Sequence, residues 1–214
     1  MAHRATRRES LRGIAIYLEG GGDSAEQKAR LRQGMGDFLS TLRDLARARR
    51  LGWKVVACGG RNAAHDAFAH AVTTEPDTFC VLLVDSEDQV TLTPIAHLRA
   101  RDDWALSGVH EDQVHLMVRT VESWLVADPD TLARYYGQGF RRHALPAAVD
   151  LETVRKVDVA QALEHATRDT QKGRYHKIRH GSDLLSKVSS DLSQRRCLHC
   201  RRLFERLGAV LQAL

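Results

Sequence analysis

Short apolar runs alternate along the chain with segments in which apolar residues recur every three or four positions. The runs IAIYL (14–18), KVVAC (54–58) and FCVLLV (79–84) have the length of β-strands. The third run is apolar throughout, which is typical of a strand covered on both faces in a parallel sheet. The pattern therefore predicts at least three strands, one of them central.

The segments between these runs have helical periodicity. Ser24 and Gln27 have the spacing of a capping box at a helix start, and Gly52 is placed to end that helix. Its predicted apolar face comprises Leu31, Met35, Phe38, Leu39, Leu42 and Leu45. A second helix is expected to begin at Asn62 and to end before Pro76. Strands alternating with helices predict an α/β fold, here a parallel-sheet Rossmannoid core.

The second half of the chain is less regular. Residues 89–112 are expected to be irregular or short-helical, 115–118 to form a fourth strand and 121–127 a helix. The last predicted helix has an apolar face made of Cys200, Leu203, Phe204, Leu207, Leu211 and Leu214. We expect three parts: a basic N-terminal segment (1–13), an α/β core (14–128) and a basic, mainly helical extension packed on it (129–214).

Composition limits the class of protein. A chain of 214 residues with 43% hydrophobic content can build a core, and its apolar runs are too short to cross a membrane. The four cysteines are few, which fits a reducing compartment, so we predict a cytoplasmic protein. The net charge of +5 is concentrated in residues 134–214, a distribution that attracts polyanions, although an ordinary arginine-rich surface gives the same pattern.

Acidic residues follow two of the predicted strands. Glu19 closes the first strand, and Asp85, Glu87 and Asp88 close the third. Since parallel strands end at a shared edge, these side chains are expected to converge there. Crowded carboxylates favour a hard divalent cation, which makes Glu19, Asp85, Glu87 and Asp88 candidate ligands for Mg²⁺ or Mn²⁺.

Three glycines follow Glu19 and add a possible phosphate contact. The run 20–22 lets the backbone approach a phosphate and turn into a helix whose N-terminus favours anions. The spacing from there to Lys28 is not that of a P-loop. Near the other end of the chain, YHKIRH (175–180) combines cations with an aromatic ring. There Lys177 and His176 can hold a phosphate backbone or stabilise charge on a leaving oxygen, with plain basic surface as the alternative.

The motifs YLEGGGD, LLVDSED and MVRTVESWLVAD resemble the Toprim domain, and more closely a family of small bacterial Toprim-like proteins. The resemblance covers residues 14–128 well and YHKIRHGSDLLSKV more loosely. Toprim domains occur in topoisomerases, primases and the nuclease part of overcoming-lysogenization-defect (OLD) proteins. Members of the closer family are often encoded beside ATPases in phage-defence contexts.

The resemblance assigns roles residue by residue. Glu19 corresponds to the Toprim glutamate, and Asp85 and Glu87 to its acidic pair, with Glu87 in place of the second aspartate. Whether Glu87 or Asp88 reaches a cation stays open, as does the choice of ligand or general base for Glu19. With Lys177, these residues would carry metal-assisted phosphodiester hydrolysis.

Glu122, Arg61 and the His176 named above are secondary candidates, and two cysteines form a separate motif. Glu122 follows the fourth strand and can aim at the same edge, or be a solvated helix carboxylate. Arg61 follows the second strand and is a weak candidate for phosphate contact. Cys197 and Cys200 resemble half a zinc site that His176 and His180 can complete, whereas buried free thiols are the alternative.

The sequence thus predicts an Mg²⁺- or Mn²⁺-dependent nuclease acting on DNA or RNA. The resemblance further implies the effector of an anti-phage system with an ABC- or AAA-type ATPase partner. The first alternative is a non-catalytic module that binds nucleic acid or a partner protein on the same fold. A weaker one is phosphoryl transfer on a small nucleotide.

Overall fold

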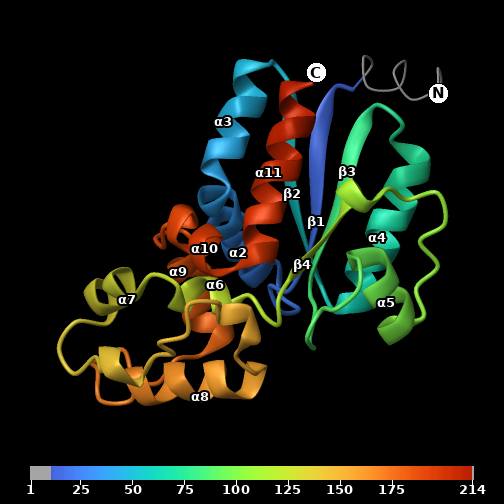
Figure 1. Cartoon of the computed structure of the whole chain (residues 1–214). Coiled ribbons are helices and arrows are strands. Elements are labelled where there is room, and N and C mark those ends of the chain that lie inside the picture. Colours follow the sequence, from blue (N-terminus) through green and yellow to red (C-terminus); the bar gives the residue numbers. More distant parts are fainter. Residues whose placement is uncertain (1–10, 214) are drawn as a thin grey trace.

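The computed structural model describes residues 11–213, and its centre is a parallel sheet (Figure 1). Strands β1 (Gly13–Glu19), β2 (Gly52–Gly59), β3 (Thr78–Asp85) and β4 (Val114–Met117) lie in the order β2-β1-β3-β4. All neighbouring pairs are parallel, and β1 runs beside β3 as far as Leu18 and Leu83. The α/β fold class predicted from the sequence is confirmed.

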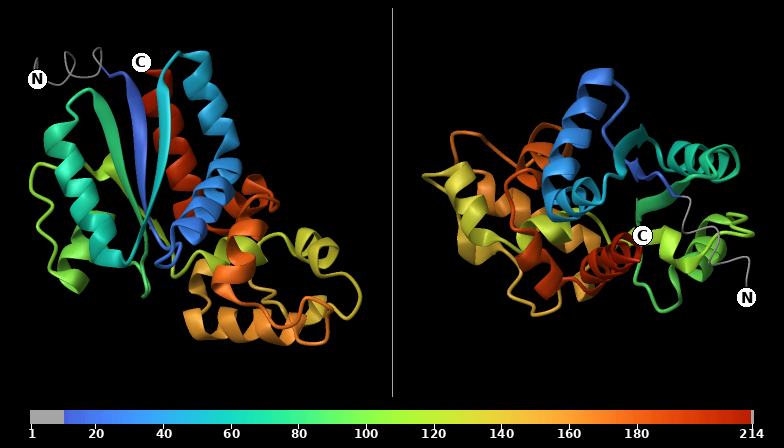
Figure 2. Two further views of the ribbon diagram at one scale, coloured as in Figure 1. Left: turned by 180° about the vertical axis from the view of Figure 1, so that it is seen from behind. Right: turned by 90° about the horizontal axis from the view of Figure 1, so that it is seen from above.

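Helices cover both faces of the sheet (Figure 2). Helices α2 (Ala25–Phe38), α3 (Ser40–Ala48) and α11 (Leu198–Gln212) lie on one face, and α4 (Arg61–Thr74) and α5 (Pro94–Asp102) on the other. Alternation along β1 explains both layers: Ile14, Ile16 and Leu18 join the first core, whereas Ala15 and Tyr17 join the second. Burial on both faces accounts for the continuous apolar runs.

The extension lies against the carboxyl edge of the sheet (Figure 1). Helix α6 (Glu122–Val126) precedes the extension, whose helices before α11 are α7 (Pro129–Tyr136), α8 (Lys156–Thr167), α9 (Ser182–Leu185) and α10 (Ser190–Arg196). Short turns join them: η2 (Arg142–Ala144), η3 (Leu151–Thr153) and the π-helical η4 (Lys177–Gly181); η1 (Glu111–Gln113) precedes β4. Leu163 and Leu184 pack in the same core as Ile16, and α11 returns to the sheet, so residue 129 does not separate two cores.

No helix among residues 11–213 combines the length and the apolar character needed to cross a membrane.

Several local predictions need correction. The capping box of Ser24 and Gln27 is confirmed, but the long predicted helix is two helices, with Leu39 between them. Gly52 begins β2 instead of ending a helix, and Gly60, not Asn62, caps α4. The predicted final helix is confirmed, with its apolar face buried; Leu214 lies outside the described residues.

Residues 89–112 contain one short α-helix, which is one of the two forms that the sequence predicted for them. Helix α5 has nine residues, begins at Pro94 and is capped by the side chain of Thr93. Proline is favoured at the first position of a helix because its missing N–H would have no partner there. Pro94 is therefore a start signal, although it reads as a break when the flanking residues are polar.

Candidate functional site

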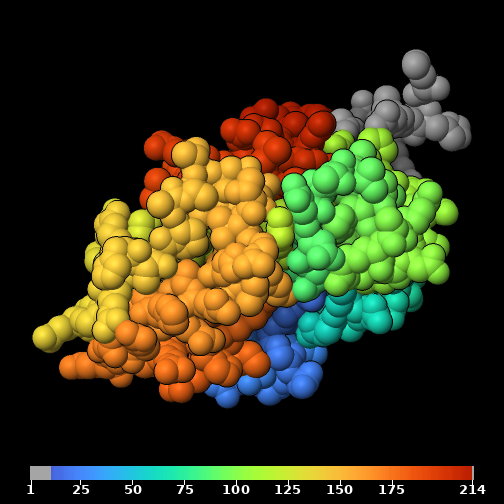
Figure 3. Space-filling model, turned by 60° about the horizontal axis from the view of Figure 1, so that its bottom comes forward, coloured from blue at the N-terminus to red at the C-terminus, as the bar shows by residue number. Residues whose placement is uncertain are grey.

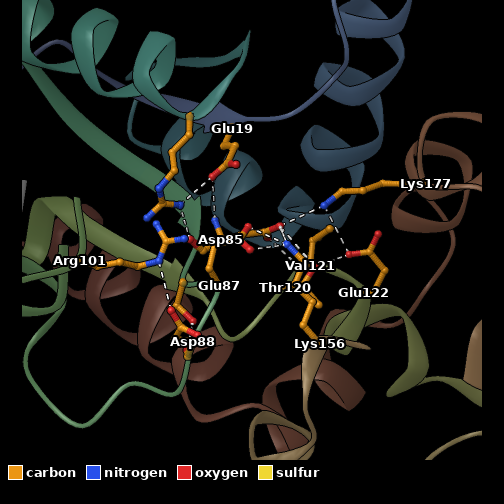
Figure 4. A network of polar contacts seen from close by, with 12 residues as sticks. Glu19, Asp85, Glu87, Asp88, Arg101, Thr120, Val121, Glu122, Lys156 and Lys177 are labelled. Carbon is orange, nitrogen blue, oxygen red and sulfur yellow. Dashed lines mark hydrogen bonds and ion pairs between the residues drawn. The ribbon is translucent and has the colours of Figure 1, made fainter. Parts of the chain in front are cut away.

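Glu19 and Asp85 meet at the carboxyl edge of the sheet, as the sequence predicted (Figure 4). They end the neighbouring strands β1 and β3, and the backbone N–H of Asp85 donates to Glu19 Oε2 over 3.2 Å. Both side chains line a cavity of about 260 Å³ together with the glycine turn 20–22. All three glycines of this turn have positive φ, which side chains rarely adopt, so the turn requires them.

Arg61 fixes the position of Glu19. Its guanidinium donates to Glu19 Oε2 over 3.0 Å and to the carbonyl of Asp85 over 2.5 Å. Two further N–H groups donate to both carboxylate oxygens of Asp102, and the guanidinium lies 5.0 Å from the ring centroid of Trp104. Since most of its donors are used within the protein, Arg61 orients a carboxylate rather than presenting itself to a phosphate.

Asp85 is buried in a dense set of donors. Its Oδ1 accepts from the backbone N–H of Val121 over 2.9 Å, and its Oδ2 accepts from Lys177 Nζ over 3.0 Å and from the Thr120 hydroxyl over 3.3 Å. Burial raises the pKa of Asp85, although Lys177 acts against it. Burial and the neighbouring Asp85 likewise raise the pKa of Glu19. Both carboxyls therefore favour a cation at this edge.

Glu122 belongs to the same network and is not a solvated helix carboxylate. Its side chain is 7% exposed and accepts from the Tyr175 hydroxyl over 2.9 Å and from the Thr120 hydroxyl. Lys177 Nζ lies 3.5 Å away, between Glu122 and Asp85. Burial alone would raise the pKa of Glu122, but Lys177 and Thr120 outweigh it and hold the pKa below its usual value.

Glu87 and Asp88 point in different directions (Figure 4). Glu87 lies in a left-handed backbone conformation, and both its carboxylate oxygens accept from Lys156 Nζ at 2.7 Å. Asp88 is 75% exposed and pairs with Arg101 over 3.4 Å, and neither Glu87 nor Asp88 lines the cavity. Of the two, Glu87 is placed nearer to Asp85, since Lys156 Nζ also lies 4.0 Å from Asp85 Oδ2.

Lys156 and Thr120 take part in the site although the sequence pattern selects neither of them, and it indicates Tyr175 only as the aromatic ring of the YHKIRH segment. Lys156 opens α8, 69 residues after its partner Glu87, within a segment that has no motif. Thr120 and Tyr175 both donate to Glu122. The signal that could have found them is proximity to selected residues: Thr120 lies two positions before Glu122, and Tyr175 two before Lys177.

Of the two alternatives for Cys197 and Cys200, half a zinc site or buried free thiols, the structure supports buried free thiols. His176 lines a second cavity of about 340 Å³ beside Lys177, and His180 Nδ1 accepts from the backbone N–H of His176. Cys197 and Cys200 are buried in the core, and burial raises the pKa of both thiols. Within residues 11–213, no three or more His, Cys, Asp or Glu side chains come together as a metal site.

The donors at the carboxyl edge nevertheless suit a hard cation. Mg²⁺ in proteins often uses one or two carboxylates and takes its remaining ligands from water and substrate phosphates. Glu19 and Asp85 supply two such carboxylates to one cavity, and burial raises the pKa of each of them. Lys177 and Arg61 neutralise them here, so a divalent cation would replace or add to these partners.

The fold and the site together define an α/β protein with an acidic cavity at the carboxyl edge of its sheet, and Lys177 is part of the cavity lining. The chain belongs to the family described as a domain of unknown function, DUF4276, whose profile matches residues 18–208. The match extends from the end of β1 into α11 and so includes Glu19, Asp85, Glu122 and Lys177. No curated protein and no solved structure matches the chain.

Proposed function

We propose that the protein is an Mg²⁺- or Mn²⁺-dependent nuclease that hydrolyses phosphodiester bonds in DNA or RNA. One observation carries the proposal: the carboxylates of Glu19 and Asp85 end adjacent strands on one cavity, and both pKa values are raised by burial. Raised values indicate that ionised carboxylates lack full compensation in the protein alone. A divalent cation together with a substrate phosphate would supply it.

The roles follow from position. Glu19 and Asp85 would hold the cation, with Glu87 able to join them when Lys156 swings away. Bound Mg²⁺ or Mn²⁺ would supply charge neutralisation at the phosphate and lower the pKa of a water. Lys177 stands between Asp85 and Glu122 with its side chain 49% exposed, so its ammonium can turn to a phosphate oxygen.

The surroundings of the cavity suit a polyanion. Lys172, Arg174 and Arg179 are exposed on the same segment as Lys177. The segment belongs to the extension, whose orange surface adjoins the green residues that follow β3 in Figure 3. Cations around an acidic cavity guide a phosphate backbone towards it without neutralising the cavity itself.

Cleavage of labelled single-stranded DNA, duplex DNA and RNA in Mn²⁺ or Mg²⁺ tests the proposal. We expect cleavage by wild type and a loss of about a thousandfold in Asp85→Asn, since several kcal/mol of charge stabilisation are removed. Asp77→Asn is the matched control: Asp77 lies just before β3, at the opposite end of the strand from Asp85, and is exposed. Equal cleavage by Asp85→Asn and wild type would refute the proposal.

The internal pairing of the carboxylates favours one second candidate, a non-catalytic binding module. Glu19, Asp85 and Glu87 each have a lysine or arginine partner in the absence of metal. A folded protein that binds nucleic acid but cleaves nothing in any metal would support this alternative.

We also propose an ATPase partner that controls access to the site. The proposal rests on the Toprim-like resemblance, and the chain has no P-loop motif of its own. The test is nuclease activity with and without an ABC- or AAA-type ATPase encoded beside this chain, in the presence of ATP. Activity that is unchanged by the ATPase would refute it.

A further inference from the structure

The cavity at the carboxyl edge has two chemically different parts. One part of it, which we call the mouth, is lined by Glu19, Asp85 and Lys177, whereas most of the other side chains that line it are apolar. The apolar residues come from α2 (Leu31 and Met35), β4 (Met117), α9 (Leu185) and the turn before α6 (Val121). Met35, Met117 and Leu185 are each no more than 2% exposed. A metal and a phosphate would use only the mouth, so the apolar part needs a different occupant.

The size of the cavity limits that occupant. At about 260 Å³ it is smaller than typical sites for whole drug-sized ligands, which span roughly 300–1,000 Å³. A flat apolar group attached to a phosphate at the mouth fits these limits. A nucleobase is such a group, and enzymes that act on nucleic acids bind unstacked bases between apolar and aromatic side chains.

A second cavity continues the path beyond the mouth. It measures about 340 Å³, and its lining includes Lys156 and His176 as well as the carboxylates of Glu122 and Glu164. Lys177 and Tyr175 line both cavities and so stand between them. A strand with one base in the apolar cavity can pass its next phosphates along Lys177 towards Lys156. Arg174 and Arg179 are exposed on the same segment as Lys177 and add positive charge there, which favours a phosphate backbone.

The backbone around Lys177 has an unusual form. Residues 177–181 make a π-helical turn, a feature that occurs frequently at functional sites. Lys177 in this turn lines both cavities, and Ile178, which is 42% exposed, lines the apolar one.

We propose that the apolar cavity binds one unpaired nucleobase of a nucleic-acid strand while the adjoining phosphate lies at Glu19, Asp85 and Lys177. The inference rests on the proposed nuclease function and narrows its substrate to single-stranded, frayed or flapped nucleotides. A base held in a duplex cannot enter the cavity without being unstacked.

Binding in EDTA tests the inference separately from cleavage. The probes are a short fluorescein-labelled strand and the same strand with abasic sites, as DNA and as RNA, and the readout is fluorescence anisotropy. We expect wild type to bind the base-containing strand at least about tenfold more tightly, because stacking of one base accounts for that much affinity. Equal affinities, or binding to neither strand, would overturn the inference.

Ser182→Phe and Ser186→Phe form a matched pair. Ser182 lines the cavity and is partly exposed, whereas Ser186 follows α9 and lines no described cavity. We expect Ser182→Phe to remove the preference for bases and Ser186→Phe to keep it. If Ser182→Phe still prefers the base-containing strand, the base does not bind in this cavity. If Ser182→Phe does not fold, the comparison of the two strands in wild type still tests the inference.

Two further outcomes distinguish a site for a strand from a site for a free nucleotide, and the base site from the nuclease function. Displacement of the strand by adenosine monophosphate at equal nucleotide concentration would overturn the assignment to a strand and indicate a free nucleotide. The proposed nuclease function fails on a different result, the absence of Mn²⁺-dependent cleavage. A protein that cleaves in Mn²⁺ but binds abasic and normal strands equally would keep its function and lose only the base site.

Discussion

The two halves of the acidic edge are neutralised in different ways. On the β1 side, Glu19 is held by Arg61, whose side chain is 15% exposed and is itself held by Asp102 and Trp104. On the β3 side, the partners are Lys177 and Lys156, whose side chains are 49% and 40% exposed. An arginine locked by two carboxylates and a ring cannot leave, whereas a lysine on a flexible stem can.

This difference separates a fixed part of the site from an exchangeable part. Arg61 sets where Glu19 points whether or not a ligand is present. Lys177 and Lys156 occupy positions beside Asp85 and Glu87 that a divalent cation would take, and they are then free for phosphate oxygens. Substitutions on each side test whether Arg61 is fixed and whether the two lysines are exchangeable.

The largest expected effect is on the fixed side. Arg61→Ala leaves Asp102 and Glu19 without their main buried partner, and we expect the free energy of unfolding to fall by about 3 kcal/mol. Urea unfolding measures it. Arg30→Ala, which removes an exposed partner of Glu26, is the control and should cost less than about 0.5 kcal/mol. A loss below about 1 kcal/mol in Arg61→Ala would mean that Arg61 is as exchangeable as the lysines.

Arg202 is another arginine with several partners inside the protein, and its neighbour His115 provides a second test. Arg202 donates to His115 Nδ1, and His115 Nε2 donates to the carbonyl of Asp112. Burial and the Arg202 charge lower the pKa of His115 to about 3. The unfolded chain therefore binds a proton below about 6.5 that the folded chain does not, and stability must fall as the pH decreases through that range.

Between pH 7.5 and pH 5 this linkage should cost about 2 kcal/mol. Urea unfolding at both values, on wild type and His115→Gln, measures it as the difference between the two proteins. Wild type should lose more stability than the variant. An equal loss in both would show that the ring becomes protonated in the folded protein despite Arg202.

The smallest effect is expected on the exchangeable side. Lys156→Met removes a cation that competes with metal near Glu87, so Mn²⁺ should bind about threefold to tenfold more tightly, or ~1 kcal/mol. Titration calorimetry measures the affinity, with the exposed Lys187→Met as control. Weaker binding in Lys156→Met would show that Lys156 holds Glu87 in place and is not a competitor.

The sequence predicts the part of the site that follows from sheet topology. Glu19 and Asp85 close apolar runs, and parallel strands bring their ends together, so their meeting needs no knowledge of side-chain packing. The same argument predicts the sheet and both helical layers. It does not locate the break at Leu39, because the apolar period continues from α2 into α3.

The partners of the carboxylates were not predictable in the same way. Lys156 contacts Glu87 only because α8 packs near the carboxyl edge of the sheet. No local pattern distinguishes it from the other five lysines of the chain. Glu122 lies off the apolar face of its helix, which suggested exposure, but the extension covers it through Tyr175 and Lys177. Contacts made by the fold between distant segments leave no periodic signal.

Calorimetric measurement of Mn²⁺ binding is the decisive test of whether Glu19 and Asp85 form one cation site. Wild type, Glu19→Gln and Asp85→Asn are compared, with circular dichroism as a check on folding. We predict that wild type binds Mn²⁺ and that both folded variants lose this binding. A folded wild type that binds no Mn²⁺ even with an oligonucleotide present, or variants that bind as well as wild type, would contradict the claim.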